Sequence, residues 1–183
     1  MVPLGEAAQD SSSVKEAVQD AVITSGGVSV GEADFTRELL GRLGEVLFWK
    51  IAMRPGRPMA VGRIGGAHFF GLPGNPVAVM VTFYGFVRDA LIALAGRTDD
   101  YALPVLQVRS ATALRKKPGR TEFQRGIVAR DADSQWTVRI TGQQGSGVLR
   151  SMSEANCFIV LEHARGDVKA GDLVSVQLFE GLA

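Results

Sequence analysis

The feature that most restricts the fold of this sequence is a change in hydrophobic pattern about halfway along its 183 residues. Up to Ala95, short apolar runs alternate with segments whose apolar residues recur at helical spacing. Alternating strands and helices predict an α/β layered unit with a largely parallel sheet. Beyond Pro104 the helical spacing disappears, and successive strand-like runs predict a small all-β, barrel-like domain. Two architectures in one short chain favour a site between them.

Three segments follow from this change. Residues 1–20 are expected to be an N-terminal remnant or linker, residues 21–97 an α/β domain and residues 104–183 the all-β domain. Within the α/β domain, strands are predicted at residues 21–23, 46–53, 59–61 and 68–72, and helices at residues 35–43 and 77–95. In the all-β domain, strands are predicted at residues 105–108, 126–129, 136–140, 158–161 and 174–178.

The composition excludes several classes of protein. A hydrophobic share of 46% with 21% charged residues is typical of a globular chain with a real core, and it excludes general disorder. The 20 basic and 19 acidic residues nearly cancel, so no overall field attracts nucleic acid or an anionic membrane. The single cysteine, Cys157, excludes an internal disulfide framework and a cysteine-based zinc site, and it fits a cytoplasmic protein.

One apolar stretch has the length of a membrane span. Residues 64–87 contain no Asp, Glu, Lys or Arg, but two prolines and two glycines at residues 71–76 stop a helix there. The remaining helical pattern carries Arg88 and Asp89 near its middle, so we interpret it as a buried helix rather than a span. Residues 1–20 show no secretion signal.

A glycine-rich turn follows the first predicted strand, with Ser25, Gly26, Gly27 and Ser29 as candidate anion-binding residues. Free backbone N–H groups at such a turn, together with a following helix dipole, suit a phosphate. The alternative is a turn that only lets the chain reverse. Asp34 lies just beyond, where a carboxylate either caps the next helix or ligates Mg²⁺ beside a bound phosphate.

Three cations, Lys50, Arg54 and Arg57, surround a Pro55–Gly56 turn. They either converge on an oxyanion or form a solvated surface, and the rigid Pro55 and Pro58 favour the site.

A second rigid turn, at residues 71–76, leads into the helix expected at Val77. The first turn of that helix either offers free N–H groups to an anion or serves as a plain connector.

In the all-β half, Arg125 and Ser146 are the candidate site residues, against the alternatives of a surface arginine and an ordinary Gly/Gln loop. His68 and His163 are isolated in the sequence, and we assign them no catalytic role.

Taken together, these motifs resemble the signature of the molybdopterin molybdenumtransferase family, which includes the gephyrin E domain. The resemblance rests on VITSGGVSVGEAD at residues 22–34, FWKIAMRPGRP at residues 48–58, GLPGNPV at residues 71–77, and the short motifs at residues 118–120, 123–126 and 145–146.

The resemblance implies the last step of molybdenum cofactor synthesis. Molybdate and adenylylated molybdopterin are bound, AMP is released and molybdenum is inserted with the help of Mg²⁺. By position, Asp34 corresponds to a functional aspartate and metal ligand, and Ser29 to a polar residue of the same loop. Lys50, Arg54 and Arg57 fall where the family binds substrate and molybdate, with Asp34 and Lys50 as the expected catalytic pair.

Arg125 and Ser146 match residues that face the same cleft from the β domain. The sequence departs from the family at Arg54 and Arg57, where lysine is frequent, and at Ala78, where serine is frequent.

The resemblance begins partway through the family's α/β domain. We therefore expect the C-terminal portion of such an enzyme, either a fragment or a truncated paralogue, which self-associates and has negligible activity alone. An inactive scaffold and a generic nucleotide-binding domain are the alternatives. The expected partners are molybdopterin or its adenylylated form, molybdate and further copies of the chain, without nucleic acid or a membrane.

Overall fold

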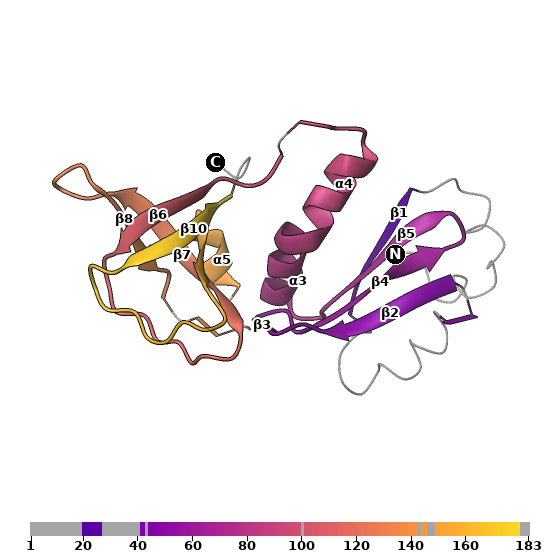
Figure 1. The fold of residues 1–183 in the computed structure, drawn as a ribbon, viewed down its shortest axis with the longest axis horizontal. Helices are drawn as coiled ribbons and strands as arrows, with labels where there is room; N and C mark the ends of the chain where they lie inside the picture. The colour runs from indigo at the N-terminus through magenta and orange to yellow at the C-terminus, as the bar shows by residue number, and fades with distance from the viewer. Residues whose placement is uncertain are drawn as a thin grey trace, which may run out of the picture.

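The structure is a computed structural model that describes residues 20–26, 41–42, 44–99, 101–142, 144–145 and 149–179. Figure 1 shows three parts: a small sheet, a helical rod and a β-barrel, with the rod standing between the other two. Most of the predicted helix at residues 35–43 lies outside the described residues.

The small sheet is mixed, not largely parallel. Its strands are β1 (Ala21–Ser25), β2 (Gly44–Lys50), β4 (Pro58–Ile64) and β5 (Ala67–Leu72), in the order β1-β5-β4-β2. Only the β1–β5 pairing is parallel, and the other two are antiparallel. The short connections explain the error, because β4 and β5 are joined by a Gly65–Gly66 hairpin turn, which permits only antiparallel strands.

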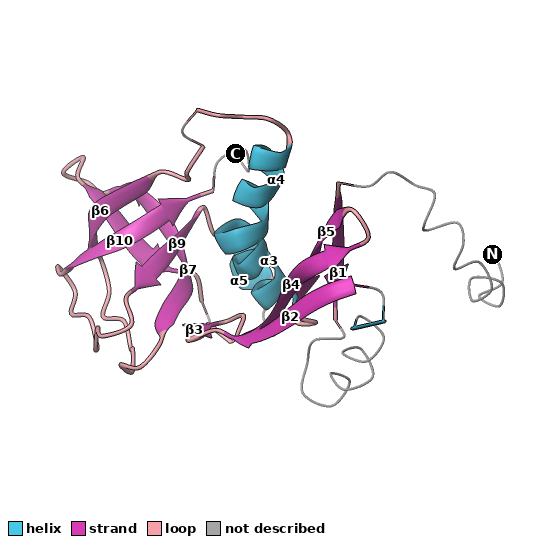
Figure 2. Ribbon diagram, turned by 45° about the vertical axis from the view of Figure 1, so that its right-hand side comes forward, coloured by secondary structure: helices cyan, strands magenta, loops and turns pink. Residues whose placement is uncertain are grey.

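The helical rod consists of α3 (Pro76–Thr82), a π-helical turn η1 (Phe83–Val87) and α4 (Arg88–Leu94). Two of its faces pack on different partners: Val77 and Val81 on the barrel side, and Val87, with Val79, on the sheet. Figure 2 shows the rod in this position. Within the described residues, one helical run, residues 76–94, passes a length-and-composition test for a membrane span. The buried residues of this run lie in α3 and at Val87, whereas α4 has none, so the prediction of a buried helix is confirmed only for the first part of the run.

The second domain is a closed five-stranded barrel, as predicted. Its strands are β6 (Val105–Ser110), β7 (Thr121–Arg130), β8 (Trp136–Ile140), β9 (Cys157–Leu161) and β10 (Leu173–Leu178). The hydrogen-bonded order β7-β8-β6-β10-β9 closes through the pairing of β7 with β9. A short helix, α5 (Arg150–Ser153), precedes β9.

Two contacts fix the barrel to the rest of the chain. The short strand β3 (Met53–Arg54) leaves the small sheet and pairs in parallel with the start of β7. An aromatic cluster then joins the rod to the barrel: Phe158 and Phe179 meet edge to face at 4.5 Å between centroids, and Tyr84 stacks on Phe179 at 5.4 Å. These contacts set the position of Arg54, on β3, relative to the barrel.

The Cys157 thiol gives a test of the barrel core. Its exposed fraction is 0%, and burial raises the pKa of the thiol to about 12. We therefore expect no labelling by an aromatic disulfide reagent at pH 8 in the native state, and full labelling in denaturant. The pKa of the Cys157 thiol is higher in the folded state than in the unfolded state. The buried, protonated thiol therefore contributes fully to the free energy of unfolding below about pH 9, and this contribution is lost as the pH rises toward 12. Rapid labelling of native protein at pH 8 would contradict the buried position.

Candidate functional site

A cavity of about 420 Å³ opens where β3 meets the barrel. Residues from β3, β7, β8 and two barrel loops line it. They are Arg54, Pro55, Ala113, Arg115, Glu122, Phe123, Gln124, Arg125, Ile140, Gln144 and Gly145.

Arg125 is the inner cation of this cavity, with an exposed fraction of 2%. The next residue, Gly126, faces the opposite side of β7, toward the barrel core, where a Cβ would lie 2.8 Å from Ile159 Cγ1 and 3.0 Å from Val138 Cγ2. Only glycine lets β7 approach the barrel core so closely. The Arg125 side chain points to the other face of β7, where Ser151 and the Gly145 carbonyl contact its guanidinium, so the alternative of a surface arginine is wrong.

The hydrogen bonds of Arg125 orient it without neutralising it. Nε donates to Ser151 Oγ at 3.1 Å, and Nη2 donates to the Gly145 carbonyl at 3.0 Å. No carboxylate lies within ion-pair distance of it in the described part of the chain. Burial, and secondarily the Arg54 guanidinium, lowers the pKa of Arg125. A desolvated cation that lacks a carboxylate and faces a cavity suits an anionic ligand.

The loop beside Arg125 is held by its own hydrogen bonds. Gln144 Oε1 accepts from the Arg125 backbone N–H at 2.8 Å, and Gln144 Nε2 donates to the Thr141 carbonyl at 2.7 Å. Thr141 Oγ1 donates to the Ser151 carbonyl at 2.8 Å. The cavity wall is thus fixed by the protein itself, which favours binding because little ordering is needed.

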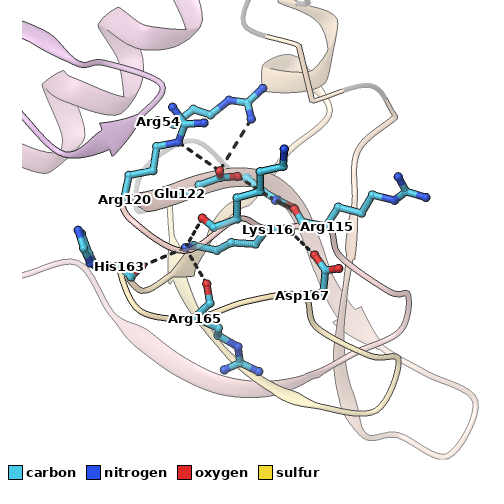
Figure 3. Close-up of polar contacts among 10 residues, drawn as sticks. Arg54, Arg115, Lys116, Arg120, Glu122, His163, Arg165 and Asp167 are labelled. Carbon is cyan, nitrogen blue, oxygen red and sulfur yellow. Dashed lines mark hydrogen bonds and ion pairs between the residues drawn. The ribbon is translucent and has the colours of Figure 1, made fainter.

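Glu122 is a buried carboxylate on the same wall, with 5% of the residue exposed. It attracts two guanidinium groups: Arg54 Nη1 at 3.8 Å and Arg120 Nε at 3.6 Å. Figure 3 shows both groups reaching the one carboxylate, Arg54 from β3 and Arg120 from the turn before β7.

The structure separates the three cations expected to converge. Arg54 lines the cavity, whereas Lys50 and Arg57 are exposed and do not belong to its wall. The turn itself is closed by a backbone hydrogen bond of 2.8 Å from Ile51 N–H to the Arg57 carbonyl. Of the three cations, this cavity therefore accounts for Arg54 alone, and the convergence of Lys50 and Arg57 on the same anion stays a prediction.

Two predicted sets of free N–H groups are not available in the described residues. The Gly26 N–H donates to the Leu72 carbonyl at 3.2 Å, next to exposed Ser25. The side chain of Asn75 accepts from Val77 N–H at 3.0 Å and from Ala78 N–H at 3.2 Å. For the turn at residues 71–76, the connector interpretation is therefore correct. Among the other predicted site residues, Gly27, Ser29, Asp34 and Ser146 lie outside the described residues.

The sequence interpretation missed Arg115, Arg120, Glu122 and Gln144. One signal was present: Arg120, Glu122 and Gln124 alternate with a period of two, which places them on one face of an extended segment. No comparable signal marks Gln144, whose role depends on the folded loop.

The described residues do not supply a metal site. They contain no group of three His, Cys, Asp or Glu side chains that could hold an ion. The carboxylate in the cavity wall, Glu122, already attracts two arginines. We therefore derive no step through Mg²⁺.

Comparison with known proteins agrees with this two-part architecture. Residues 4–93 match the family described as "Probable molybdopterin binding domain", and residues 107–179 match "MoeA C-terminal region (domain IV)". A molybdopterin molybdenumtransferase of Haemophilus influenzae is 46% identical over 89% of this chain, and a gephyrin of Dictyostelium discoideum is 33% identical over 87%. The matches cover 40% and 25% of those relatives, so the chain spans less than half of their length.

Solved structures give the same result. A molybdenum cofactor biosynthesis protein from Pyrococcus furiosus superposes with a TM-score of 0.65 at 28% identity, over 87% of this chain and 49% of that one. A molybdopterin biosynthesis moeA protein from a second Pyrococcus species gives a TM-score of 0.68 at 29% identity, over 90% of this chain and 38% of that one.

The fold and the matches define a two-domain chain, in which an α/β domain of the family described as "Probable molybdopterin binding domain" is joined to a barrel of the MoeA C-terminal type. The chain belongs to the molybdopterin molybdenumtransferase family and corresponds to its C-terminal portion.

Proposed function

We propose that this chain forms part of the site at which molybdenum from molybdate is inserted into adenylylated molybdopterin, with release of AMP. The observation that carries the proposal is the buried Arg125 guanidinium, which faces the cavity without a carboxylate partner in the described residues. Molybdate is a tetrahedral dianion, and a guanidinium group binds such oxyanions through paired, charge-assisted hydrogen bonds.

In this proposal each part of the chain has a separate task. The α/β domain binds the pterin substrate, and the barrel arginines hold molybdate beside it. Arg125 is fixed by Ser151 and by the Gly145 carbonyl, so it meets the oxyanion in a set orientation. Arg54 approaches from β3, so the closure of the β3–β7 pairing brings the two cations to the same cavity.

Several residues enter only through the resemblance. Asp34 and Lys50 remain the proposed catalytic residues, with Asp34 as the proposed Mg²⁺ ligand. Gly27, Ser29, Ser146 and Arg57 remain proposed substrate-binding residues. Self-association of the chain and its location in the cytoplasm also remain proposals, and turnover is expected to require the N-terminal portion that the longer relatives have.

Replacing Arg54 with Ala tests the anion site. We expect molybdate affinity to fall by about one to two orders of magnitude, because a charge-assisted hydrogen bond contributes about 1.5–3 kcal/mol. Isothermal titration calorimetry with molybdate measures this effect. The matched control is Arg109→Ala on β6, outside the cavity wall, where Nη1 donates to the Gly171 carbonyl.

Two outcomes would contradict the proposal. Equal molybdate affinity in wild type and Arg54→Ala would show that Arg54 is a solvated surface residue and does not bind the anion. A wild-type chain that binds neither molybdate nor molybdopterin would instead support the scaffold alternative.

A further inference from the structure

We propose that Arg120 and Arg54, held together on Glu122, form a second anion subsite at the mouth of the cavity, which binds a phosphate monoester while Arg125 binds the oxyanion. Arg54, which lines the same wall as Arg125, is shared by the two anions. The identification of that ester as the phosphate of molybdopterin rests on the proposed function. The subsite itself rests on the geometry of three described side chains.

The two guanidinium groups are held in place, but their hydrogen-bond donors are not used. Contacts of 3.6 and 3.8 Å to Glu122 are within ion-pair range and beyond hydrogen-bond length. In the described part of the chain, neither Arg54 nor Arg120 donates to any other acceptor. Their side chains are 57% and 45% exposed, so the donors are accessible from solvent. A ligand oxygen can therefore bind without breaking an existing hydrogen bond.

The buried carboxylate explains how two like charges remain together. Two guanidinium groups at one site repel each other, and Glu122, with 7% of its side chain exposed, lies within ion-pair distance of both. One carboxylate for two cations leaves one positive charge unbalanced. That surplus, displayed on exposed donors, attracts an anionic group.

Hydrogen bonds to the loop at residues 163–167 hold the turn that carries Arg120. Lys116 is 4% exposed, and its ammonium donates to the Arg165 carbonyl at 2.9 Å and to the Lys117 carbonyl at 3.2 Å. The Lys116 backbone N–H donates to Asp167 Oδ1 at 2.7 Å (Figure 3). The Gly119 N–H donates to the His163 carbonyl at 2.9 Å. On the other side, the Thr121 N–H donates to the Ala52 carbonyl at 2.9 Å, so the backbone on both sides of Arg120 is fixed before any ligand arrives.

The charge of the wall favours two anions over one. Arg54, Arg115 and Arg125 line the cavity, Arg120 adjoins it, and Glu122 is the one acid among the described lining residues. A single dianion would leave this cationic surface partly unbalanced. Two anionic groups, one at Arg125 and one at the mouth, match it better and bring an oxyanion and a phosphate ester into one cavity.

Calorimetric titration of the full chain with inorganic phosphate and with molybdate tests the subsite. With molybdate present, we expect wild type to bind phosphate in addition to molybdate. Arg120→Gln should weaken phosphate binding about tenfold and change molybdate affinity by less than about twofold. The matched control Arg109→Gln should change neither, and circular dichroism should show that both variants are folded.

The outcomes separate this subsite from the proposed function. Displacement of molybdate by phosphate at a single site would overturn the subsite, and so would unchanged phosphate affinity in Arg120→Gln. If wild type binds phosphate through Arg120 but does not bind molybdate, the subsite is supported and the proposed function fails.

Discussion

Replacing Phe158 with Ala is expected to lower the free energy of unfolding by about 3–5 kcal/mol. Phe158 is 1% exposed and contacts the rings of Tyr84, Phe123 and Phe179. Its removal leaves a cavity between the helical rod and the barrel, in a cluster that also holds Val77 and Val81. Urea unfolding followed by circular dichroism measures the change.

The control is Leu173→Ala, at a β10 position that is 52% exposed, which should change the free energy of unfolding by less than about 0.5 kcal/mol. The Phe158 variant should also bind molybdate more weakly, because the same cluster positions Arg54 relative to Arg125. A loss of stability as small as that of the control would show that the packing of the helical rod on the barrel does not depend on Phe158.

Most elements of the fold could be predicted because each depends on local pattern, whereas the break between β2 and β3, the π-helical turn η1 and the helix α5 were not predicted. The five barrel strands are rich in β-branched and other apolar residues and are separated by turn residues, so their existence follows from local composition and turn chemistry. The relative directions of the strands in the small sheet could not be predicted in the same way. No helix separates β2 from β4, because only the short strand β3 lies between them, and a two-residue hairpin joins β4 to β5. Both pairings are therefore antiparallel, although a helical segment follows the sheet.

The candidate site could be predicted only in part, for a physical reason. Arg54 and Arg125 stand out in the sequence as cations next to turns or glycines, and the structure brings them to one cavity. Glu122 could not be identified in this way, because a glutamate in a strand usually faces solvent. Its significance comes from burial and from two partners at sequence separations of 68 and 2, which only the folded chain reveals.

Replacing Arg125 with Met is expected to abolish most molybdate binding while leaving the protein folded. The variant loses the inner guanidinium, and with it about two orders of magnitude in affinity. The free energy of unfolding should change by no more than about 1 kcal/mol. Two hydrogen bonds are lost, to Ser151 and Gly145, but the cost of burying a cation without a described carboxylate disappears as well.

Thermal unfolding with and without molybdate measures both effects together. A ligand at a hundred times its Kd stabilises the native state by about 2.7 kcal/mol, so molybdate should raise the Tm of wild type. The same concentration should leave the Tm of Arg125→Met nearly unchanged, whereas Arg109→Met, outside the cavity wall, should respond as wild type does. A variant at position 125 that molybdate still stabilises fully would place the oxyanion elsewhere. A variant that is unfolded without molybdate would show that Arg125 is needed for the barrel itself, since a guanidinium retained for binding alone can be removed without loss of the fold.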